Sequence, residues 1–594
     1  MSTYAAPLRD MEFVLREVAD LAGVAALPGF DEASPELVEA VLGEASRLAG
    51  EVLAPANKLG DLEGTRVVDG GVRVPEAFKR AYATFVEGGW PGLKFSPEHG
   101  GQGLPALVST AVEEMWQASN MAFALCPLLT QGAIDAIELH GSEAQKALYL
   151  GHMVTGRWTG TMNLTEPQAG SDLAAVRTRA EPRDDHYLLS GQKIFITWGD
   201  HDVAENIIHL VLARTPDAPP GVKGISLFIV PKFLVAADGS LGERNDVYPV
   251  SVEHKLGIHG SPTCVMSFGD HGGAKGFLVG EENQGLVYMF TMMNKARLAV
   301  GVQGLAISER AYQQALGYAR ERVQGTLPGH EGRATIIHHA DVRRMLMLMK
   351  CQIEAMRALA YSTMSALDYA ERAADPALRQ ARQARVDLLT PVVKGWCTEV
   401  AQELTSLGVQ VHGGMGYIEE TGASQHFRDA RITTIYEGTT GIQAMDLVGR
   451  KTLRDGGAAQ RALLADMQAT LADLEGAGAS LATLREALAA GLQAQQSALE
   501  WLLRHAGDSP DAAASAAFNL LMLMGTVAGG WQLARGALAA GRLLAAGEGD
   551  SDYLQSRLAT ARFYAAHVLP RAQAYLRAAT TGAPEVMSVP PEQL

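Results

Sequence analysis

The sequence predicts an α+β protein that is mostly α-helical, because one β-rich segment interrupts a chain with helical periodicity. Apolar residues recur at helical spacing over residues 35–155 and again over residues 285–453. Between them, residues 157–285 contain short apolar or alternating runs separated by Gly, Pro and Asp turns, which are typical of antiparallel strands. After residue 456 the chain is rich in Ala, Leu and Arg and again favours helices. The expected order is therefore helical, antiparallel β, helical, and an added helical domain.

Local signals set the expected limits of these regions. Residues 34–36 are Ser-Pro-Glu, a sequence typical of a helix start. Apolar runs at residues 187–189, 207–212 and 225–230 predict strands, and Gly456-Gly457 marks the boundary of the added domain. The predicted regions are an N-terminal extension (1–36), a helical domain (37–157), a β domain (158–285), a second helical domain (286–455) and an added helical domain (456–594).

The composition bounds the class of protein. The 594 residues are enough for about four domains. The 50 Lys and Arg residues against 66 Asp and Glu residues give a net charge of −16, which repels phosphate backbones and argues against nucleic acid as a partner. The cysteines lie far apart without metal-ligand spacing, so we expect reduced thiols and no metal site. They are Cys126, Cys264, Cys351 and Cys397.

Two segments bear on location. Residues 1–9 lead into acidic residues without the hydrophobic region of a secretory signal. Residues 512–534 are uncharged and long enough to cross a bilayer, but they are rich in Ala and Gly and include four polar side chains. We expect a buried helix at 512–534 rather than a membrane span, and a cytoplasmic protein.

The signatures of several common enzyme classes are missing from the sequence. No G-x-G-x-x-G follows a predicted strand, and neither G-x-x-x-x-G-K-[ST] nor G-x-S-x-G occurs. Dinucleotide-binding Rossmann proteins, nucleoside triphosphatases and serine hydrolases therefore lose support.

The first candidate ligand-binding segment is residues 164–172, Leu-Thr-Glu-Pro-Gln-Ala-Gly-Ser-Asp, at the entrance to the β region. A loop with Pro and Gly leaves backbone amides open to a ligand, and the hydroxyls of Thr165 and Ser171 add short donors. Such a loop suits a heteroaromatic ring edge or a phosphate. The alternative is a capped surface turn.

The second candidate segment is residues 193–199, Lys-Ile-Phe-Ile-Thr-Trp-Gly. In a regular strand, Phe195 and Thr197 lie on one face, so an aromatic plane and a hydroxyl can approach one ligand together. The alternative is an ordinary β-strand.

The third candidate segment is residues 435–441, Ile-Tyr-Glu-Gly-Thr-Thr-Gly, just before a helix expected to begin near Ile442. A carboxylate at Glu437, placed on a loop before a Gly-Thr-Thr-Gly turn, can face a cavity and act as a general base. The alternative is that Glu437 caps the following helix, where a negative charge is favourable.

In combination these segments resemble the acyl-CoA dehydrogenase family. The resemblance covers roughly residues 37–453 and rests on motifs that occur in the family's order. The motifs are residues 97–103, 141–146, 165–172, 193–199, 255–261, 410–417 and 435–440.

This resemblance implies an N-terminal helical domain, a central antiparallel β domain and a C-terminal four-helix bundle. It also implies non-covalent FAD and the α,β-desaturation of a saturated acyl-CoA thioester to trans-2-enoyl-CoA. By analogy, Glu437 takes the α-proton, flavin N5 takes the β-hydride, and the Glu437 N–H holds the thioester carbonyl with a ribityl hydroxyl. A dry pocket would raise the pKa of Glu437. Electron-transferring flavoprotein is the implied electron acceptor.

The resemblance also implies roles for individual residues. Thr165 and Thr197 would hydrogen-bond the flavin edge and Phe195 would pack on its face. Residues near 322–324 and 410–414 would reach the FAD of a neighbouring subunit, which implies at least a homodimer. The implied FAD contacts are Met162, Leu164, Thr165, Gly170, Ser171, Phe195, Thr197, Arg322, Gln324, Gln410, Gly413, Gly414, Tyr436 and Thr439. The implied substrate contacts are Ser171, Asn294, Arg297 and Gly438.

The chain departs from the family pattern at three places. Phe195 stands where many relatives have Trp, residues 322–325 lack the aromatic residue of R-x-x-F-G, and Asn294 replaces a common Asp. Residues 4–11 and the domain after Gly456 resemble a large bacterial branch that acts on methylthio and medium- to long-chain acyl thioesters. We expect the added domain to cover the surface that forms tetramers elsewhere, which would leave a dimer.

Three alternatives share the expected fold. An acyl-CoA oxidase would use the same base but pass electrons to O2, and no residue in the sequence decides between the two. A DNA-associated relative would need a basic C-terminal domain, whereas residues 456–594 carry a net charge of −3, from nine Arg against twelve Asp and Glu. A silent flavin-binding scaffold is disfavoured by the intact Glu437-Gly438-Thr439 sequence.

Overall fold

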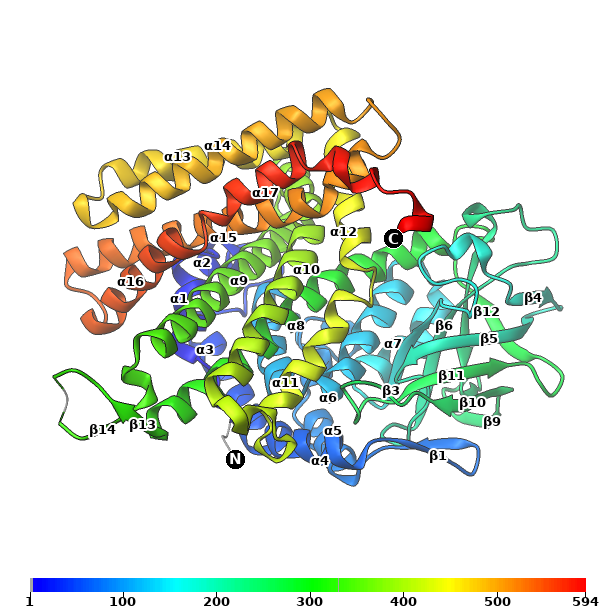
Figure 1. Ribbon diagram of the computed structural model, residues 1–594. Helices are drawn as coiled ribbons and strands as arrows, with labels where there is room; N and C mark the ends of the chain where they lie inside the picture. The colour runs from blue at the N-terminus through cyan, green and yellow to red at the C-terminus, as the bar shows by residue number, and fades with distance from the viewer. Residues whose placement is uncertain (1–3, 330) are drawn as a thin grey trace. The chain divides into compact units, whose positions relative to one another are not determined.

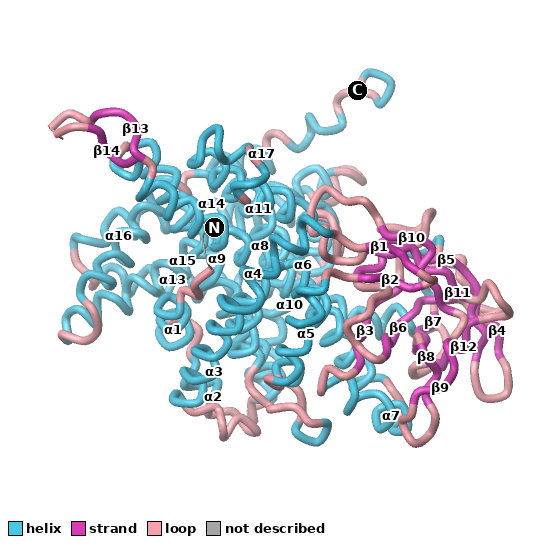
Figure 2. The backbone as a smooth tube through the Cα atoms, turned by 90° about the horizontal axis from the view of Figure 1, so that it is seen from below, coloured by secondary structure: helices cyan, strands magenta, loops and turns pink. Residues whose placement is uncertain are grey.

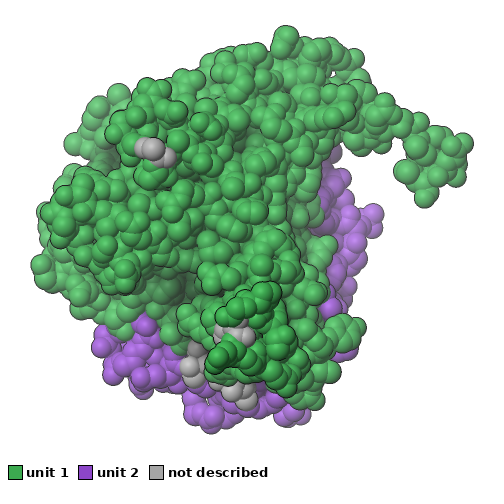
Figure 3. Space-filling model, turned by 60° about the vertical axis from the view of Figure 1, so that its left-hand side comes forward, with its two compact units in different colours: residues 1–43, 105–114, 297–594 green, residues 44–104, 115–296 purple. Residues whose placement is uncertain are grey.

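The computed structural model describes residues 4–329 and 331–594. The chain forms two compact units, which Figure 3 distinguishes by colour. The sheet unit comprises residues 44–104 and 115–296, and the helical unit comprises residues 1–43, 105–114 and 297–594. Each unit is therefore assembled from segments that are distant in the sequence.

The sheet unit contains an eight-stranded sheet in the order β10-β11-β5-β12-β7-β6-β3, with β4 paired to β5 (Figure 1). Neighbouring strands run antiparallel, as the sequence predicts, except that β3 pairs with β6 in parallel. The strands are β3 (Trp158–Asn163), β4 (Arg179–Pro182), β5 (Tyr187–Thr197), β6 (Asn206–Ala213), β7 (Ser226–Pro231), β10 (Val247–Val252), β11 (Thr263–Phe268) and β12 (Ala274–Leu278). Short two-stranded pairs are β1 (Arg66–Val68) with β2 (Gly71–Arg73), and β8 (Phe233–Val235) with β9 (Leu241–Arg244).

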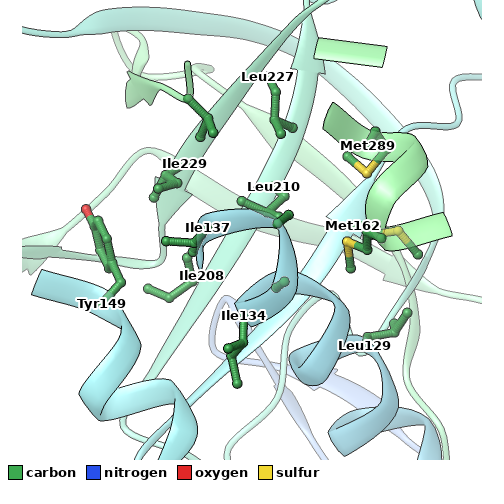
Figure 4. Close-up of a cluster of buried hydrophobic side chains, with 14 of the residues drawn as sticks. Leu129, Ile134, Ile137, Tyr149, Met162, Ile208, Leu210, Leu227, Ile229 and Met289 are labelled. Atoms are coloured by element: carbon green, nitrogen blue, oxygen red, sulfur yellow. The ribbon is translucent and has the colours of Figure 1, made fainter. Parts of the chain in front are cut away.

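Helices cover one face of this sheet and build its main core. Ile134 and Ile137 of α6 (Ala106–His140), with Tyr149 of α7, pack toward Ile208 of β6 and Leu227 of β7 (Figure 4). Every residue of β6 and β7 is buried, which explains their continuous apolar runs. Other helices of the sheet unit are α4 (Ala54–Glu63), α5 (Glu76–Glu87) and α7 (Glu143–Val154), and α3 (Pro35–Leu48) runs from the helical unit into it.

The helical unit is built on long helices that follow the sheet in the sequence, and Figure 2 draws all helices of the chain in cyan. They are α8 (Gly285–Glu321, which begins in the sheet unit), α9 (Ala340–Arg372), α10 (Pro376–His412), α11 (Ala423–Ala430) and α12 (Thr440–Met445). The hairpin of β13 (Val323–Thr326) and β14 (Arg333–Thr335) separates α8 from α9. The added domain contains α13 (Ala458–Glu475), α14 (Ala482–His505), α15 (Ala512–Ala546), α16 (Ser551–His567) and α17 (Arg571–Thr580).

Helix α15 contains the long uncharged segment noted in the sequence. It packs on α10 through Gly525 and Gly529: a Cβ on Gly525 would lie 2.2 Å from a ring atom of Trp396, so glycine permits the close approach. Helices α6 and α15 are long and apolar enough to cross a membrane, but 78% and 67% of their most apolar windows are buried inside the structure. The predicted buried helix is confirmed.

The N-terminal extension joins the added domain. Its helices are α1 (Leu8–Glu17) and α2 (Leu21–Ala25). The Tyr553 hydroxyl of α16 donates a 2.8 Å hydrogen bond to Asp10, and the Arg557 guanidinium lies 4.7 Å from the centre of the Phe13 ring. The two segments outside the common core of the resemblance, which are farthest apart in sequence, therefore stabilise each other.

Candidate active site

The Glu437 carboxylate lies on a tight turn between two short helical segments of the helical unit. The backbone is left-handed at both Glu437 (φ +55°) and Gly438 (φ +84°), a conformation that is strained for Glu and natural for Gly. Helix α12 starts two residues later, and the Thr439 side chain caps it by accepting a hydrogen bond from Ile442 N–H. Glu437 is therefore not the helix cap, which removes the alternative interpretation of this segment.

The carboxylate and the backbone N–H of Glu437 form no hydrogen bonds with the described residues. Burial raises the pKa of the Glu437 carboxyl, while the positive charges of Arg297 and Lys394 act in the opposite direction. A carboxylate with a raised pKa and without a structural partner is suited to accept a proton from a substrate.

Two side chains hold the turn in place through its carbonyl oxygens. Lys394 of α10 donates from Nζ to the Gly438 carbonyl at 2.7 Å. Gln443 of α12 donates from Nε2 to the carbonyls of both Glu437 and Gly438, each at 3.1 Å. Burial lowers the pKa of Lys394 to about 8, and the Glu437 charge opposes that shift.

In the sheet unit, a buried ion pair joins the loop at residues 164–172 to strand β5. The Glu166 carboxylate lies 2.8 Å from Lys193 Nζ on β5, and it also accepts hydrogen bonds from Thr178 Oγ1 and the Arg177 N–H. Glu166 and Lys193 are 3% and 0% exposed. Burial opposes ionisation of Glu166, but Lys193 and these donors hold its pKa well below the ordinary value. These contacts anchor the start of the loop to β5, and the Asp172 side chain caps the short 3-10 helix that follows the loop.

Strand β5 does not alternate regularly at the second candidate segment. Cys264 of β11 pairs with Ile196 and Met266 pairs with Lys193, so a β-bulge forms around Phe195. Phe195 has φ +59° and is 60% exposed, and the Ile194 N–H is turned to the Thr165 carbonyl at 2.9 Å. One extra residue is inserted opposite β11 between Lys193 and Ile196, so the regular alternation expected from the sequence is interrupted there. Phe195 and Thr197 remain more exposed than the buried Ile196 between them.

The remaining candidates of the sheet unit differ in exposure. Met162 is buried in the core cluster of Figure 4, and Leu164 packs against the same cluster. Gly170 and Ser171 are exposed at the end of the loop, and Asn294 is exposed on α8.

The remaining candidates of the helical unit fall into two groups. Tyr436 and Arg297 are engaged by the fold: the Tyr436 hydroxyl donates to Gln303 Oε1, and Arg297 is 3% exposed and lies 3.5 Å from an Asp446 oxygen. The others are exposed at helix and hairpin ends. These exposed residues are Arg322, Gln324, Gln410, Gly413, Gly414 and Thr439.

Sequence reasoning missed Lys394, Gln443 and the structural role of the Glu166–Lys193 pair. A signal for Lys394 exists, because a lone lysine follows two valines in an apolar run of α10 and is fully buried. No local pattern shows that its partner is a carbonyl oxygen 44 residues away.

The exposed surface of the loop and bulge fits a flavin. An aromatic plane at Phe195, a partly exposed hydroxyl at Thr197 and a Gly-Ser loop offer stacking and short hydrogen-bond donors to a heteroaromatic ring. In the helical unit, Gln410, Gly413, Gly414 and residues 322–324 are exposed, whereas Val411 and His412 are buried.

Comparison with known proteins places this architecture among flavin-dependent oxidoreductases that act on CH–CH bonds. Residues 41–157, 161–271 and 283–452 match the N-terminal, middle and C-terminal domains of acyl-CoA dehydrogenases, and residues 463–590 match the domain described as acetyl-CoA dehydrogenase C-terminal like. The 3-methylmercaptopropionyl-CoA dehydrogenase of Ruegeria pomeroyi is 52% identical over 96% of each chain. A butyryl-CoA dehydrogenase of Syntrophomonas wolfei is 36% identical over 99% of each chain. The chain belongs to the acyl-CoA dehydrogenase family.

The structural comparison agrees over nearly the whole chain. The acyl-CoA dehydrogenase of Bacillus anthracis, solved with FAD, superposes with a TM-score of 0.75, 20% identity, and coverage of 97% of this chain and 94% of that one. This likeness supports the fold, including the added C-terminal helices. The protein is thus an FAD-dependent enzyme that desaturates an acyl-CoA thioester.

Proposed function

We propose that Glu437 is the general base that removes the α-proton of the acyl-CoA thioester. The observation that carries this assignment is a carboxylate with no hydrogen-bond partner among the described residues, held on a left-handed turn, with a pKa raised by burial. The α-proton of a thioester is weakly acidic, so its removal also needs stabilisation of the enolate oxygen. The unengaged N–H of Glu437 supplies a donor for that oxygen.

Other residues of the chain are proposed to shape the turn and to bind FAD and the substrate. Gly438 keeps the turn free of a side chain: a Cβ there would lie 2.7 Å from Gln443 Nε2. Thr165 and Thr197 hold the flavin edge, Phe195 packs on the ring, and Ser171 contacts both FAD and the pantetheine arm. FAD, when bound, accepts the hydride that leaves the β-carbon. Arg322, Gln324 and residues 410–414 contact the FAD of a second subunit.

We propose a short linear acyl-CoA as the substrate class. Relatives that match nearly the whole chain include enzymes named for 3-methylmercaptopropionyl-CoA and butyryl-CoA, and one that is named as broad-specificity for linear acyl-CoAs. The first two acyl groups are short and unbranched, and both offer a saturated Cα–Cβ bond. The reaction then belongs to acyl-chain degradation of the β-oxidation type.

An anaerobic visible titration tests the substrate assignment. The flavin-loaded protein is mixed with 3-(methylthio)propionyl-, butyryl-, octanoyl- and palmitoyl-CoA, and loss of the flavin absorbance band is followed. We expect the two short thioesters to bleach the band fastest. Fastest bleaching by palmitoyl-CoA would overturn the chain-length assignment, and no bleaching by any thioester would overturn the proposed reaction.

Electron-transferring flavoprotein is proposed as the electron acceptor, and a homodimer in the cytoplasm as the working form. The added domain supports the dimer, because its helices pack against the bundle helices α9 and α10. Light scattering coupled to gel filtration measures this directly. A mass near two protomers of 63.1 kDa is expected, and a mass near four would contradict the proposal.

A further inference from the structure

We propose that Lys394 is a positioning residue for the desaturation: its ammonium group fixes the Glu437–Gly438 turn and thereby aims both the Glu437 carboxylate and the Glu437 N–H. This inference rests on the proposed role of Glu437 as the base. Lys394 itself touches neither substrate nor cofactor in this scheme.

The first argument is the unusual environment of the ammonium group. Lys394 is 0% exposed, and the only hydrogen bond that its ammonium group makes within the described residues is the 2.7 Å bond to the Gly438 carbonyl. It forms no ion pair with a carboxylate of the described chain. Burying a positive charge on a neutral acceptor costs free energy, so packing does not account for a lysine here.

The second argument is the strain of the turn that Lys394 holds. A non-glycine residue at φ +55° persists only where surrounding contacts fix it. Gln443 reaches the turn from α12, on the same short segment, whereas Lys394 reaches it from the long helix α10. Neighbouring residues also contact the long helices, Tyr436 through Gln303 of α8 and Thr440 through Glu399 of α10. Lys394 is the side chain that ties the left-handed turn itself to α10.

The third argument is electrostatic. Lys394 faces Glu437 from α10 and Arg297 faces it from α8, so both charges favour the carboxylate over the protonated acid. When Lys394 is removed, Arg297 is the positive charge that still favours the ionised form of Glu437. Other charged or titratable groups lie near these three residues. Tyr436 is next to Glu437, and Glu399 is near Lys394. Asp446 and Arg450 are near Arg297.

Two variants of the flavin-loaded full chain separate the hydrogen bond from the charge. Lys394→Met removes both, and Lys394→Gln keeps an N–H donor without the charge. We expect Lys394→Met to lower kcat about tenfold to a hundredfold with KM changed little, because a small misplacement of a reacting group costs that much. Lys394→Gln should retain a larger share of kcat.

The pH profile provides the readout that a purely structural role would not move. Both variants lose the positive charge, so the rise of kcat with pH should occur at higher pH than in the wild type. The matched control is Lys350→Met on α9, which removes a partly buried lysine paired with Glu354 at 2.7 Å. The control should leave the pH profile unchanged even if its melting temperature falls.

The outcomes are distinct. Wild-type kcat and an unshifted pH profile in Lys394→Met would overturn the inference. Loss of flavin and of melting temperature in proportion to lost turnover, in both Lys394 variants, would replace it with a structural role. If Glu437→Gln, measured in parallel, keeps wild-type turnover, the base assignment itself fails, whereas an inactive Glu437→Gln beside unaffected Lys394 variants refutes only the role of Lys394.

Discussion

The Glu166 carboxylate and the Lys193 ammonium form a 2.8 Å ion pair that joins the 164–172 loop to strand β5. Lys193 Nζ also donates to the Leu164 carbonyl at 3.0 Å, so a single side chain holds two residues at the start of the loop. Glu166 directly follows Thr165, which is proposed to hold the flavin edge. Breaking the ion pair should therefore reduce the retention of FAD as well as the stability of the protein.

Lys193→Met tests this link. The substitution leaves the buried Glu166 carboxylate without its partner, and breaking a buried pair in this way costs about 3–5 kcal/mol. We expect a lower melting temperature and FAD that is lost during gel filtration, measured by the ratio of flavin to protein absorbance. The control is Arg157→Gln, which breaks an exposed pair with Glu205 at 2.9 Å and should cost less than about 1 kcal/mol. Full flavin retention by Lys193→Met would contradict the link between this ion pair and FAD binding.

Phe195→Gly separates cofactor binding from folding. Glycine removes the aromatic plane but relieves the left-handed backbone at φ +59°, so we expect FAD to bind about fivefold more weakly, a loss of about 1 kcal/mol of stacking. The free energy of unfolding of the apoprotein should not fall. Phe518→Ala, an exposed aromatic residue on α15 that is 43% exposed, is the control for FAD affinity. A clear loss of apoprotein stability in Phe195→Gly would assign the ring to the fold instead.

The sequence is informative about Glu437 because a short motif contains the proposed base, the glycine that follows it and the helix cap together. It predicts the order of helical and β regions from periodicity alone. It does not reveal the parallel pairing of β3 with β6, because pairing direction depends on the long connection between them and not on local alternation.

The bulge at Phe195 and the contact of Lys394 escape sequence analysis for a related reason. One inserted residue shifts a strand's register without changing its composition, and Phe195 keeps an ordinary β-strand sequence around it. Lys394 acts on a turn 44 residues later, so its role depends on how α10 packs beside α12.

The turnover should depend on pH through Glu437. The base works as the carboxylate, so kcat/KM rises as pH rises through its pKa, and burial places that pKa above the ordinary value of 4.5. We expect the midpoint of the acid limb to lie clearly above that of an exposed glutamate. The measurement is the initial rate of flavin bleaching across a pH series at low substrate concentration. A rate already at its plateau at pH 5 would show that the carboxylate is not desolvated before substrate binds.

Glu437→Gln should lose activity and gain stability at high pH. Without the base, turnover should fall by at least about 10⁴-fold, the upper range for general base catalysis, while FAD stays bound.

Because the pKa of Glu437 is raised in the folded protein, the folded state holds its proton more tightly than the unfolded state. The favourable contribution of the protonated Glu437 to the free energy of unfolding is therefore present at low pH. It is lost as pH rises through the folded-state pKa, because the ionised carboxylate stays desolvated in the folded protein. The neutral amide avoids this loss, so the melting temperature of Glu437→Gln should exceed that of the wild type at pH 8 and match it near pH 4. Glu420→Gln, at an exposed position, is the control for both readouts. Equal melting temperatures at pH 8 would show that Arg297 and Lys394 fully compensate the burial of the base.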